Sequence, residues 1–301
     1  MRLAKAQPPK PSIPRAAVNP PERLIARMLR VADYQTDGEK ASNRPAVPVK
    51  VGDSVPAQVH GAAIERIIGS SDLVSVAFLA RGLAAARTVG CVTVLRDDGS
   101  PLLQATGVLV SPSLLLTTAH VITSIQDAGR ARVEFDYQDG ADGRLLRPTS
   151  IACDPSAFFF SDSESDTTVV ALQDRDIGRR LGWTRLTEEE GKAVVGEKLS
   201  IIQHASGTPK QLALRATSVI DISEMFLHCA AGPDASSSGS PLFNDQWELI
   251  GIHRARVPST NKQGKILTRT GRIWSPGNDA SEIAFVAIEA VRVGSSARSR
   301  R

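Results

Sequence analysis

The stretch GCVTVLRDDGSPLLQATGVLVSPSLLLTTAH, residues 90–120, decides the fold class of this 301-residue chain. It contains three short runs rich in valine, leucine and threonine, separated by breakers such as Asp97-Asp98-Gly99-Ser100-Pro101. Short apolar runs bounded by Gly, Pro and Asp are typical of β-strands. The stretch therefore predicts the start of a β-rich domain, and it ends on His120.

Similar runs continue downstream of this stretch. The predicted strands are 91–95, 105–110, 114–118, 131–137, 168–172, 199–203, 212–222, 226–229 and 249–253. So many short strands exceed one small barrel and suit two packed ones. We expect a mainly β fold: two packed antiparallel barrels of the six-stranded type, with the functional site in the cleft between them. An N-terminal helical extension and a C-terminal helix complete the predicted fold.

Composition divides the chain into an arm, a domain and a tail. The predicted parts are a basic, proline-rich arm (1–61), largely disordered with one short helix, then a domain (62–293) and an arginine-rich tail (294–301). Within the domain we expect a helical lead-in (62–89), two barrels (90–257) and a helix at about 281–291. Because prolines and charge oppose core packing, residues 1–60 are predicted to be dispensable for folding.

Two helices are predicted ahead of the barrels. The first begins at Pro21, which suits a first helical turn, and its apolar face comprises Leu24, Ile25, Met28, Leu29 and Ala32. The second is capped by Ser71 or Asp72, and its apolar stripe comprises Phe78, Leu79, Leu83 and Ala86.

The net charge of +4 is unevenly distributed. Residues 1–50 carry ten basic and four acidic residues, and residues 292–301 carry four arginines and no acid. Solvated tails account for such runs, and recruitment of nucleic acid or an acidic protein by the basic arm is an alternative. Nucleic acid is not the expected partner, because the chain has no Gly-rich phosphate loop and no patch that mixes aromatic and basic residues.

Cysteine usage and hydropathy suggest a cytoplasmic protein. The three cysteines, Cys91, Cys153 and Cys229, form no C-x-x-C pair, so we expect reduced thiols rather than disulfides or a zinc site. No apolar signal core follows the first residues, and no run of about 18 apolar residues would cross a membrane.

The first motif that carries chemistry is LLLTTAH, residues 114–120. An apolar strand ends on small residues and delivers His120 at its edge, where a general base is held rigidly yet stays open to a substrate. A packed or surface histidine is the alternative for this motif taken alone.

The second motif is SDSESDTTVVAL, residues 161–172. An acidic loop leads into an apolar strand, and Asp166 at the junction can fix the tautomer of a histidine. Asp162 is the rival within the loop, and a turn-forming aspartate is the alternative.

The third motif is ASSSGSPLF, residues 235–243. Its small residues let the Ser238 hydroxyl stand clear and let neighbouring N–H groups point at one spot, as an oxyanion hole requires. A flexible Ser/Gly loop is the alternative.

The three motifs gain specificity together. His120, Asp166 and Ser238 come in this order, 46 and 72 residues apart, with the first two in the first half of the β region and the serine in the second. The order differs from those of α/β-hydrolases and subtilisins. The sequence therefore predicts a catalytic triad between two barrels.

These motifs resemble a known group of enzymes. T-A-H and S-G-S-P are similar to the trypsin/chymotrypsin-like serine peptidases, and S-G-S-P with Asn244-Asp245 and Gly251-Ile252-His253 resembles their V8-like, glutamyl endopeptidase branch. Residues 63–89 and 243–248 look like intracellular bacterial trypsin-like peptidase domains, some of which occur in signalling or conflict systems. The resemblance covers roughly residues 62–293.

The resemblance implies a serine endopeptidase that acts on proteins or peptides without a cofactor or metal. The backbone N–H groups of Ser236 and Ser238 would form the oxyanion hole, and His253 would contact an acidic P1 residue. A signalling or defence-system partner would bind the arm. Two positions depart from the family pattern: Ser236 stands where glycine is usual, and Pro233 stands where the glutamate-specific members carry Thr or Ser.

The remaining histidines and Cys229 are weaker candidates for functional residues. His60, His204 and His228 have no metal-ligand spacing, and Cys229 lacks the turn that would present a nucleophile. The main functional alternative is a protease-fold binding or signalling module with weak or no catalysis, which Ser236 favours and the complete triad opposes.

Overall fold

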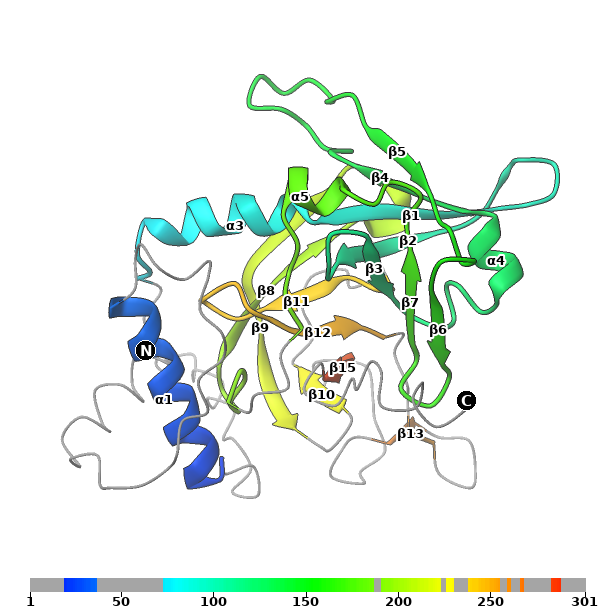
Figure 1. Cartoon of the computed structure of the whole chain (residues 1–301). Coiled ribbons are helices and arrows are strands. Elements are labelled where there is room, and N and C mark those ends of the chain that lie inside the picture. The colour runs from blue at the N-terminus through cyan, green and yellow to red at the C-terminus, as the bar shows by residue number, and fades with distance from the viewer. Residues whose placement is uncertain are drawn as a thin grey trace, which may run out of the picture.

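The computed structural model describes residues 19–36, 73–186, 191–222, 226–229, 238–254, 259–260, 266–267 and 283–287. Two antiparallel sheets lie side by side in this part of the chain, with few helices around them (Figure 1). The predicted mainly β fold is confirmed. No helix within the described residues is long and apolar enough to span a bilayer.

The first sheet has seven strands in the order β5-β4-β1-β2-β3-β7-β6. They are β1 (Val89–Leu95), β2 (Pro101–Leu109), β3 (Leu114–Thr117), β4 (Ala131–Phe135), β5 (Thr149–Ala152), β6 (Phe159–Asp162) and β7 (Thr167–Ala171). An isolated antiparallel bridge between Cys153 and Leu172 joins the chain after β5 to the end of β7. The sheet therefore curls back on itself, with seven strands rather than the six expected.

The second sheet is a closed six-stranded barrel in the order β10-β15-β12-β11-β8-β9. Its strands are β8 (Lys198–Gln203), β9 (Gln211–Ile222), β10 (Phe226–Cys229), β11 (Pro241–Phe243), β12 (Leu249–His253) and β15 (Ile283–Ala287). A separate pair, β13 (Ser259–Thr260) and β14 (Ile266–Leu267), forms a two-stranded sheet. All nine strands predicted from the sequence are present, several shifted at their ends by a few residues.

The strand β15 corrects two predictions. The sequence predicts a helix over about 281–291, and it ends the barrels at residue 257, but Ile283–Ala287 is a strand of the second barrel. Leu227 of β10 pairs with Phe285, and Ile252 of β12 pairs with Val286. Strands on both sides satisfy the backbone N–H and C=O groups of this segment, and local sequence spacing carries no information about such partners.

The helix before β1, α3 (Ala77–Arg87), presents a different face to the protein than predicted. Its buried residues are Phe78, Gly82 and Ala85, whereas the predicted Leu79 and Leu83 are 59% and 69% exposed. A Cβ at Gly82 would lie 2.5 Å from the Trp247 ring, whose Nε1 donates to the carbonyl of Phe78 at 2.8 Å. Glycine permits this close approach, and the contact turns that side of the helix inward.

The start of α3 also differs from the prediction. Its N-cap is Val76, which makes no capping hydrogen bond, and the predicted caps Ser71 and Asp72 lie outside the described residues. The other short helices in the described part of the chain are α4 (Ile125–Gly129), α5 (Ile177–Leu181) and η1 (Ala205–Gly207).

The predicted helix in the arm is present as α1 (Pro21–Thr36), and its side chains form ion pairs with residues that flank strands of the second barrel. Among residues 21–31, whose burial the structure describes, the buried side chain is Arg27, whereas the predicted apolar residues Leu24, Ile25, Met28 and Leu29 are half-buried. Arg27 pairs with Glu197 and Glu248, and Arg30 also pairs with Glu248. The helix is therefore held to the barrel by buried charges.

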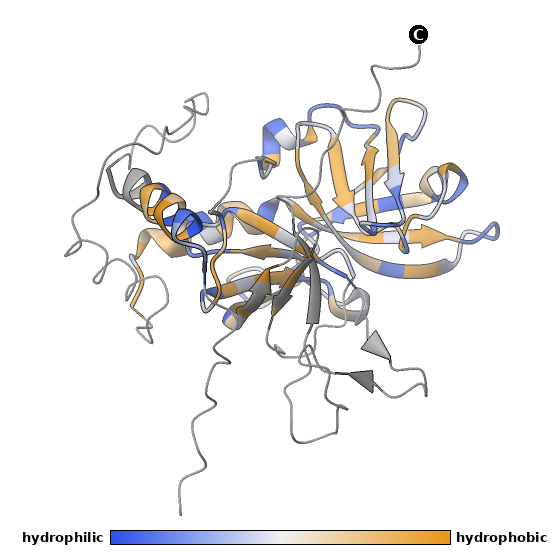
Figure 2. Cartoon of the chain, turned by 90° about the horizontal axis from the view of Figure 1, so that it is seen from below, coloured by the Kyte–Doolittle hydropathy of each residue, from blue (hydrophilic) through white to orange (hydrophobic). Residues whose placement is uncertain are grey.

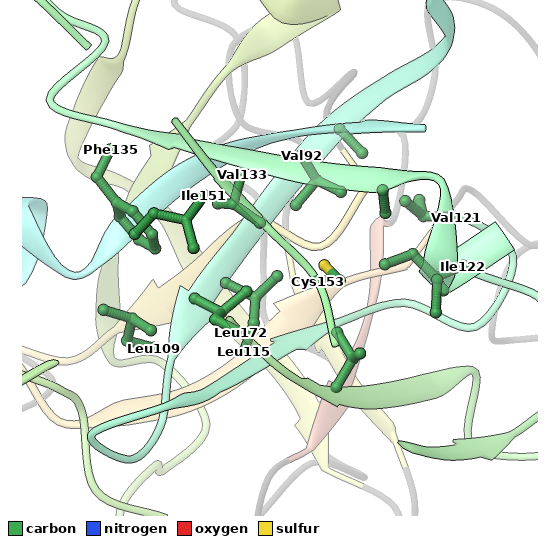
Figure 3. Packing of buried hydrophobic residues seen from close by; sticks show 14 of the residues in the cluster. Val92, Leu109, Leu115, Val121, Ile122, Val133, Phe135, Ile151, Cys153 and Leu172 are labelled. Atoms are coloured by element: carbon green, nitrogen blue, oxygen red, sulfur yellow. The ribbon is translucent and has the colours of Figure 1, made fainter. Parts of the chain in front are cut away.

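Among the residues that the structure describes, the core consists of three clusters of buried apolar residues. One fills the first sheet, where Val92, Leu115, Val133 and Leu172 point toward one another (Figure 3). A second fills the barrel around Leu199. The third joins the two sheets and α3, and comprises Phe78, Ala85, Val89, Val108, Val110, Leu116, Val169, Ile202, Phe243, Trp247, Leu249 and Ile252. Apolar residues lie mainly on the strands and polar residues on the turns (Figure 2).

Candidate active site

The end of β3 delivers His120. Leu115 to Thr118 are fully buried, and the chain turns at once, with the N–H groups of Val121 and Ile122 both directed to the carbonyl of Thr118. The His120 side chain remains 39% exposed at this edge. A buried strand thus fixes the backbone while the imidazole reaches solvent.

Asp166 lies in the turn between β6 and β7, where Asp162 pairs with Thr167. Its φ of +54° is in the left-handed region, which aspartate tolerates better than most residues. The carbonyl of Asp166 accepts the Ala119 N–H at 3.1 Å, which joins this turn to the end of β3. The carboxylate is buried beside His120.

The two carboxylate oxygens of Asp166 both face His120. Oδ1 accepts the His120 backbone N–H at 3.0 Å, and Oδ2 lies 2.8 Å from Nδ1. Since an ionised carboxylate only accepts hydrogen bonds, Nδ1 carries the proton. Nε2 is then an acceptor, and the Ser238 Oγ lies 2.7 Å from it. The structure therefore brings the three predicted residues into one hydrogen-bonded chain.

Asp162, the rival carboxylate, is used elsewhere. Its Oδ2 accepts the Ser165 hydroxyl at 2.6 Å, and its Oδ1 accepts the Glu164 N–H at 3.1 Å. The Ser165 hydroxyl is the main cause of the lowered pKa of Asp162. This aspartate shapes the turn that presents Asp166.

The turn after Ser238 is tied to both sheets. Gly239 has a φ of +81°, its N–H donates to the carbonyl of His253 at 2.8 Å, and the His253 N–H donates to the Ser240 carbonyl at 2.7 Å. The Ser238 carbonyl accepts the Thr106 N–H of β2 at 2.9 Å. The nucleophile candidate is thus anchored to the first sheet as well as to β12.

Thr106 is a structural residue of the site that sequence reasoning missed. Besides the hydrogen bond from its N–H to Ser238, Thr106 accepts two others. Its carbonyl oxygen accepts a hydrogen bond from the Thr117 hydroxyl at 2.8 Å, and its side-chain hydroxyl accepts one from the His204 backbone N–H at 2.9 Å. It lies in the predicted strand 105–110, where nothing in the local pattern marks one threonine as a bridge between two sheets.

Arg254 is the second residue that the sequence did not place at the triad. Its Nε lies 3.3 Å from Oδ2 of Asp166, the same oxygen that faces His120 Nδ1. The Arg254 side chain is 23% exposed. In the sequence it directly follows His253, and nothing in the local pattern relates it to Asp166.

His253 is buried at the end of β12. Its backbone lies next to the Ser238 turn through the two hydrogen bonds with Gly239 and Ser240. Two further positions of the predicted site, Ser236 of the oxyanion hole and Pro233, lie outside the described residues.

The remaining histidines and cysteines stand apart from this chemistry. Burial lowers the pKa of His204 to about 4, and His60 and the side chain of His228 lie outside the described residues. Cys91, Cys153 and Cys229 are free and buried, and burial raises the pKa of each thiol. Within the described part of the chain, no group of three or more His, Cys, Asp or Glu could hold a metal ion.

Comparison with known proteins relates the central region to one class of enzymes. Residues 105–252, which include the site and most of both sheets, match the model of a family described as the trypsin-like peptidase domain. This match covers His120, Asp166 and Ser238.

One curated relative is an uncharacterized protein, y4fB, of Sinorhizobium fredii. It is 33% identical over 253 residues, which are 76% of this chain and 38% of the relative, so the chain spans well under half of that protein. A glutamyl endopeptidase structure in complex with MPD has a TM-score of 0.45 at 13% identity, covering 74% of this chain and 94% of that one. The inactive Ser343Ala mutant of Rv3671c from M. tuberculosis has a TM-score of 0.42 at 14% identity, covering 69% and 84%.

Proposed function

We propose that this protein is a serine endopeptidase that cleaves peptide bonds in protein or peptide substrates through an acyl-enzyme. The observation that carries the proposal is the chain Asp166–His120–Ser238, with distances of 2.8 and 2.7 Å between the interacting atoms. The match of residues 105–252 to the trypsin-like peptidase domain supports the same reaction class.

In the proposed mechanism, Ser238 Oγ attacks the substrate carbonyl while His120 Nε2 takes its proton. His120 then gives this proton to the leaving amine, and water repeats the cycle to release the acid and regenerate the serine hydroxyl. Asp166 orients His120 and stabilises the imidazolium. The backbone N–H groups of Ser238 and Ser236 hold the oxyanion, and no cofactor takes part.

Labelling with a fluorophosphonate probe tests the proposal, because attack of Ser238 Oγ on the phosphorus, with loss of fluoride, requires an activated hydroxyl and a working oxyanion hole. We expect labelling and casein hydrolysis by the wild type, and a loss of about 10⁴-fold or more in kcat for Ser238→Ala and His120→Ala. Casein cleavage by Ser238→Ala at the wild-type rate would contradict the assignment.

The two aspartates give a matched comparison. Asp166→Asn keeps the shape of the side chain but removes the carboxylate that holds the His120 tautomer, so we expect a loss of about 10⁴-fold in kcat. Asp162→Asn changes a turn contact and should lose far less. Equal losses in the two variants would mean that Asp166 acts only through the turn.

A preference for acidic P1 residues is the finer part of the proposal. His253 supports it, since this buried histidine adjoins the Ser238 turn and an imidazole can donate to a carboxylate. A peptide library should show cleavage after Glu or Asp. Preferred cleavage after Leu, Phe or Lys would contradict this specificity.

The second candidate function is a protease-fold binding or signalling module with weak or no catalysis. The specific observation in its favour is Ser236, which stands where the trypsin/chymotrypsin-like peptidases that the motifs resemble usually have glycine. A stably folded protein that binds a partner through the N-terminal arm but is not labelled by the fluorophosphonate probe would support it.

We also propose a cytoplasmic location, since all three cysteines are free thiols.

A further inference from the structure

The carboxylate of Asp166 has a charged neighbour besides His120. Arg254 Nε lies 3.3 Å from Asp166 Oδ2, and the same oxygen lies 2.8 Å from His120 Nδ1. The Asp166 side chain is 8% exposed and that of Arg254 is 23% exposed, so the ion pair is sheltered from solvent. Screening by water and salt is weak at such a site.

Arg254 reaches Asp166 from the other sheet. It follows His253, the last residue of β12, whose backbone is hydrogen-bonded to Gly239 and Ser240 beside the nucleophile. Asp166 belongs to the β6–β7 turn of the first sheet. The ion pair therefore links the backbone that carries Ser238 to the carboxylate that orients His120.

We propose that Arg254 is a positioning residue of the triad: it fixes the Asp166 carboxylate and opposes accumulation of positive charge on His120 during proton transfer. This inference rests on the proposed peptidase function. In the resting site, Arg254 and Asp166 balance each other while the imidazole is neutral. When His120 takes the serine proton, two cations face one carboxylate, so the imidazolium gives its proton to the leaving amine more readily.

The other charged groups around the pair do not supply this effect. Asp162, in the same turn as Asp166, is bound to Ser165, and Glu164 is exposed. Arg256, two residues after Arg254, lies outside the described residues. Among the described ion pairs of Asp166, Arg254 is the partner that bears a permanent charge.

The geometry also bears on how Arg254 would affect substrate specificity. As a basic neighbour of His253, it could be taken for a contact of an acidic P1 side chain. In the structure its guanidinium is engaged with Asp166. Its removal is therefore expected to reduce kcat for substrates with any P1 residue, rather than to raise KM for acidic ones alone.

The test compares Arg254→Gln with Arg254→Lys and with a control, Arg215→Gln. Arg215 Nε lies 3.3 Å from Asp245 Oδ1, so the control removes a sheltered ion pair of the same length in the same barrel but away from the triad. We expect Arg254→Gln to lower kcat by about 10- to 100-fold with KM nearly unchanged, since a loosened carboxylate misplaces the base. Arg254→Lys should recover part of the loss.

The pH profile distinguishes this role from a merely structural one. Removing the cation favours the imidazolium, so the low-pH limb of kcat/KM in Arg254→Gln should move to higher pH by about half a unit or more. Arg215→Gln should leave this limb in place. An unmoved limb in Arg254→Gln, or an equal loss of kcat in both variants, would overturn the proposal.

A second measurement separates this inference from the peptidase proposal. The pH midpoint of the His120 imidazole resonance, followed by NMR, reports the charge balance whether or not the protein turns over substrate. We expect a higher midpoint in Arg254→Gln than in the wild type and in Arg215→Gln. A wild type that fails to hydrolyse casein contradicts the proposed function, whereas equal midpoints contradict the role of Arg254.

Discussion

At the scale of single residues, the candidate site depends on two left-handed backbone conformations. Asp166 has a φ of +54°, and Gly239, directly after the candidate nucleophile, has a φ of +81°. At Gly239 a second constraint acts, because an added Cβ would overlap the carbonyl oxygen of Thr106 and lie 2.6 Å from the Thr117 hydroxyl. The close approach of β2 to this turn therefore requires glycine.

We predict that Gly239→Ala displaces Ser238 from His120. The added methyl group cannot be accommodated without moving the turn or β2, so kcat should fall by about 100-fold or more, because small misplacements have large effects on rate. The measurement is the rate of hydrolysis together with probe labelling of Ser238.

Gly99→Ala is the matched control for this variant. Gly99 has the same φ of +81°, but no atom lies within 4 Å of an added Cβ. The Gly99→Ala variant should therefore be less stable by about 1 kcal/mol, which is the cost of an alanine in the left-handed conformation, and its kcat should be unchanged. If Gly239→Ala were as active as Gly99→Ala, the contact with β2 would not determine the position of the nucleophile.

At the scale of secondary-structure elements, the docking of α1 is the feature that composition did not predict. Arg27 is 1% exposed and pairs with Glu197, which is 2% exposed, and with Glu248 and Gln246 of the β11–β12 hairpin. Burial raises the pKa of Glu197 to about 7, and Arg27 opposes that shift. Charges in such a place are stable only while they are paired.

We predict that Arg27→Met lowers the free energy of unfolding by about 3 kcal/mol, because it leaves buried carboxylates without their cation. In the double variant Arg27→Met/Glu197→Met the loss should be smaller than the sum of the single losses. Urea unfolding curves measure these energies. Arg130→Met, which removes ion pairs with the exposed Asp97 and with Asp127, should lose less than about 1 kcal/mol.

These contacts alter what we expect of the N-terminal arm. Its prolines and charge predict that residues 1–60 are dispensable for folding, but a truncated protein of residues 61–301 would lack Arg27. Such a protein should be destabilised at least as much as Arg27→Met. Equal unfolding energies for the truncated and full-length proteins would show that α1 adds nothing to stability.

At the scale of the whole molecule, the two sheets meet at buried polar groups as well as at an apolar cluster. His204, which follows β8, is fully buried, and its ring stacks on that of Tyr137 with the centroids 5.8 Å apart. Its Nδ1 lies 3.0 Å from the carbonyl oxygen of Thr208. Nearby, the Lys210 ammonium donates to the Ala86 carbonyl at 2.7 Å. These contacts help fix the relative position of β3 and β11, and so of His120 and Ser238.

We predict that His204 makes the fold sensitive to acid. Burial, followed by the nearby charge of Lys210, lowers its pKa from 6.5 to about 4. The unfolded chain therefore takes up a proton that the folded protein resists, so stability is full above pH 6.5 and is lost as the pH falls toward 4. The loss should reach about 3 kcal/mol in urea unfolding between pH 7 and pH 4.

His204→Asn is the control for this pH effect. Asparagine keeps a donor for the Thr208 carbonyl but does not titrate, so its unfolding energy should depend less on pH over this range, even though the loss of stacking lowers it at pH 7. The same slope with pH in the variant and the wild type would assign the acid sensitivity to other groups.

Periodicity and short motifs in the sequence predicted most of the fold. Strands such as 114–118 and 199–203 are continuous apolar runs that end at breakers, and such runs depend little on distant partners. His120, Asp166 and Ser238 were found because each follows or precedes a strand at a turn and because their order is specific. Local sequence patterns and the order of the three motifs were therefore enough to propose these residues.

Only the tertiary structure decided the rest. Ile283–Ala287 is a strand because β10 and β12 bind it on both sides, and α3 faces inward at Gly82 because Trp247 packs there. Arg254 meets Asp166, and Arg27 meets Glu197, across 88 and 170 residues of sequence. In each case the free energy comes from a partner that is distant in sequence, and local propensity contains no information about it.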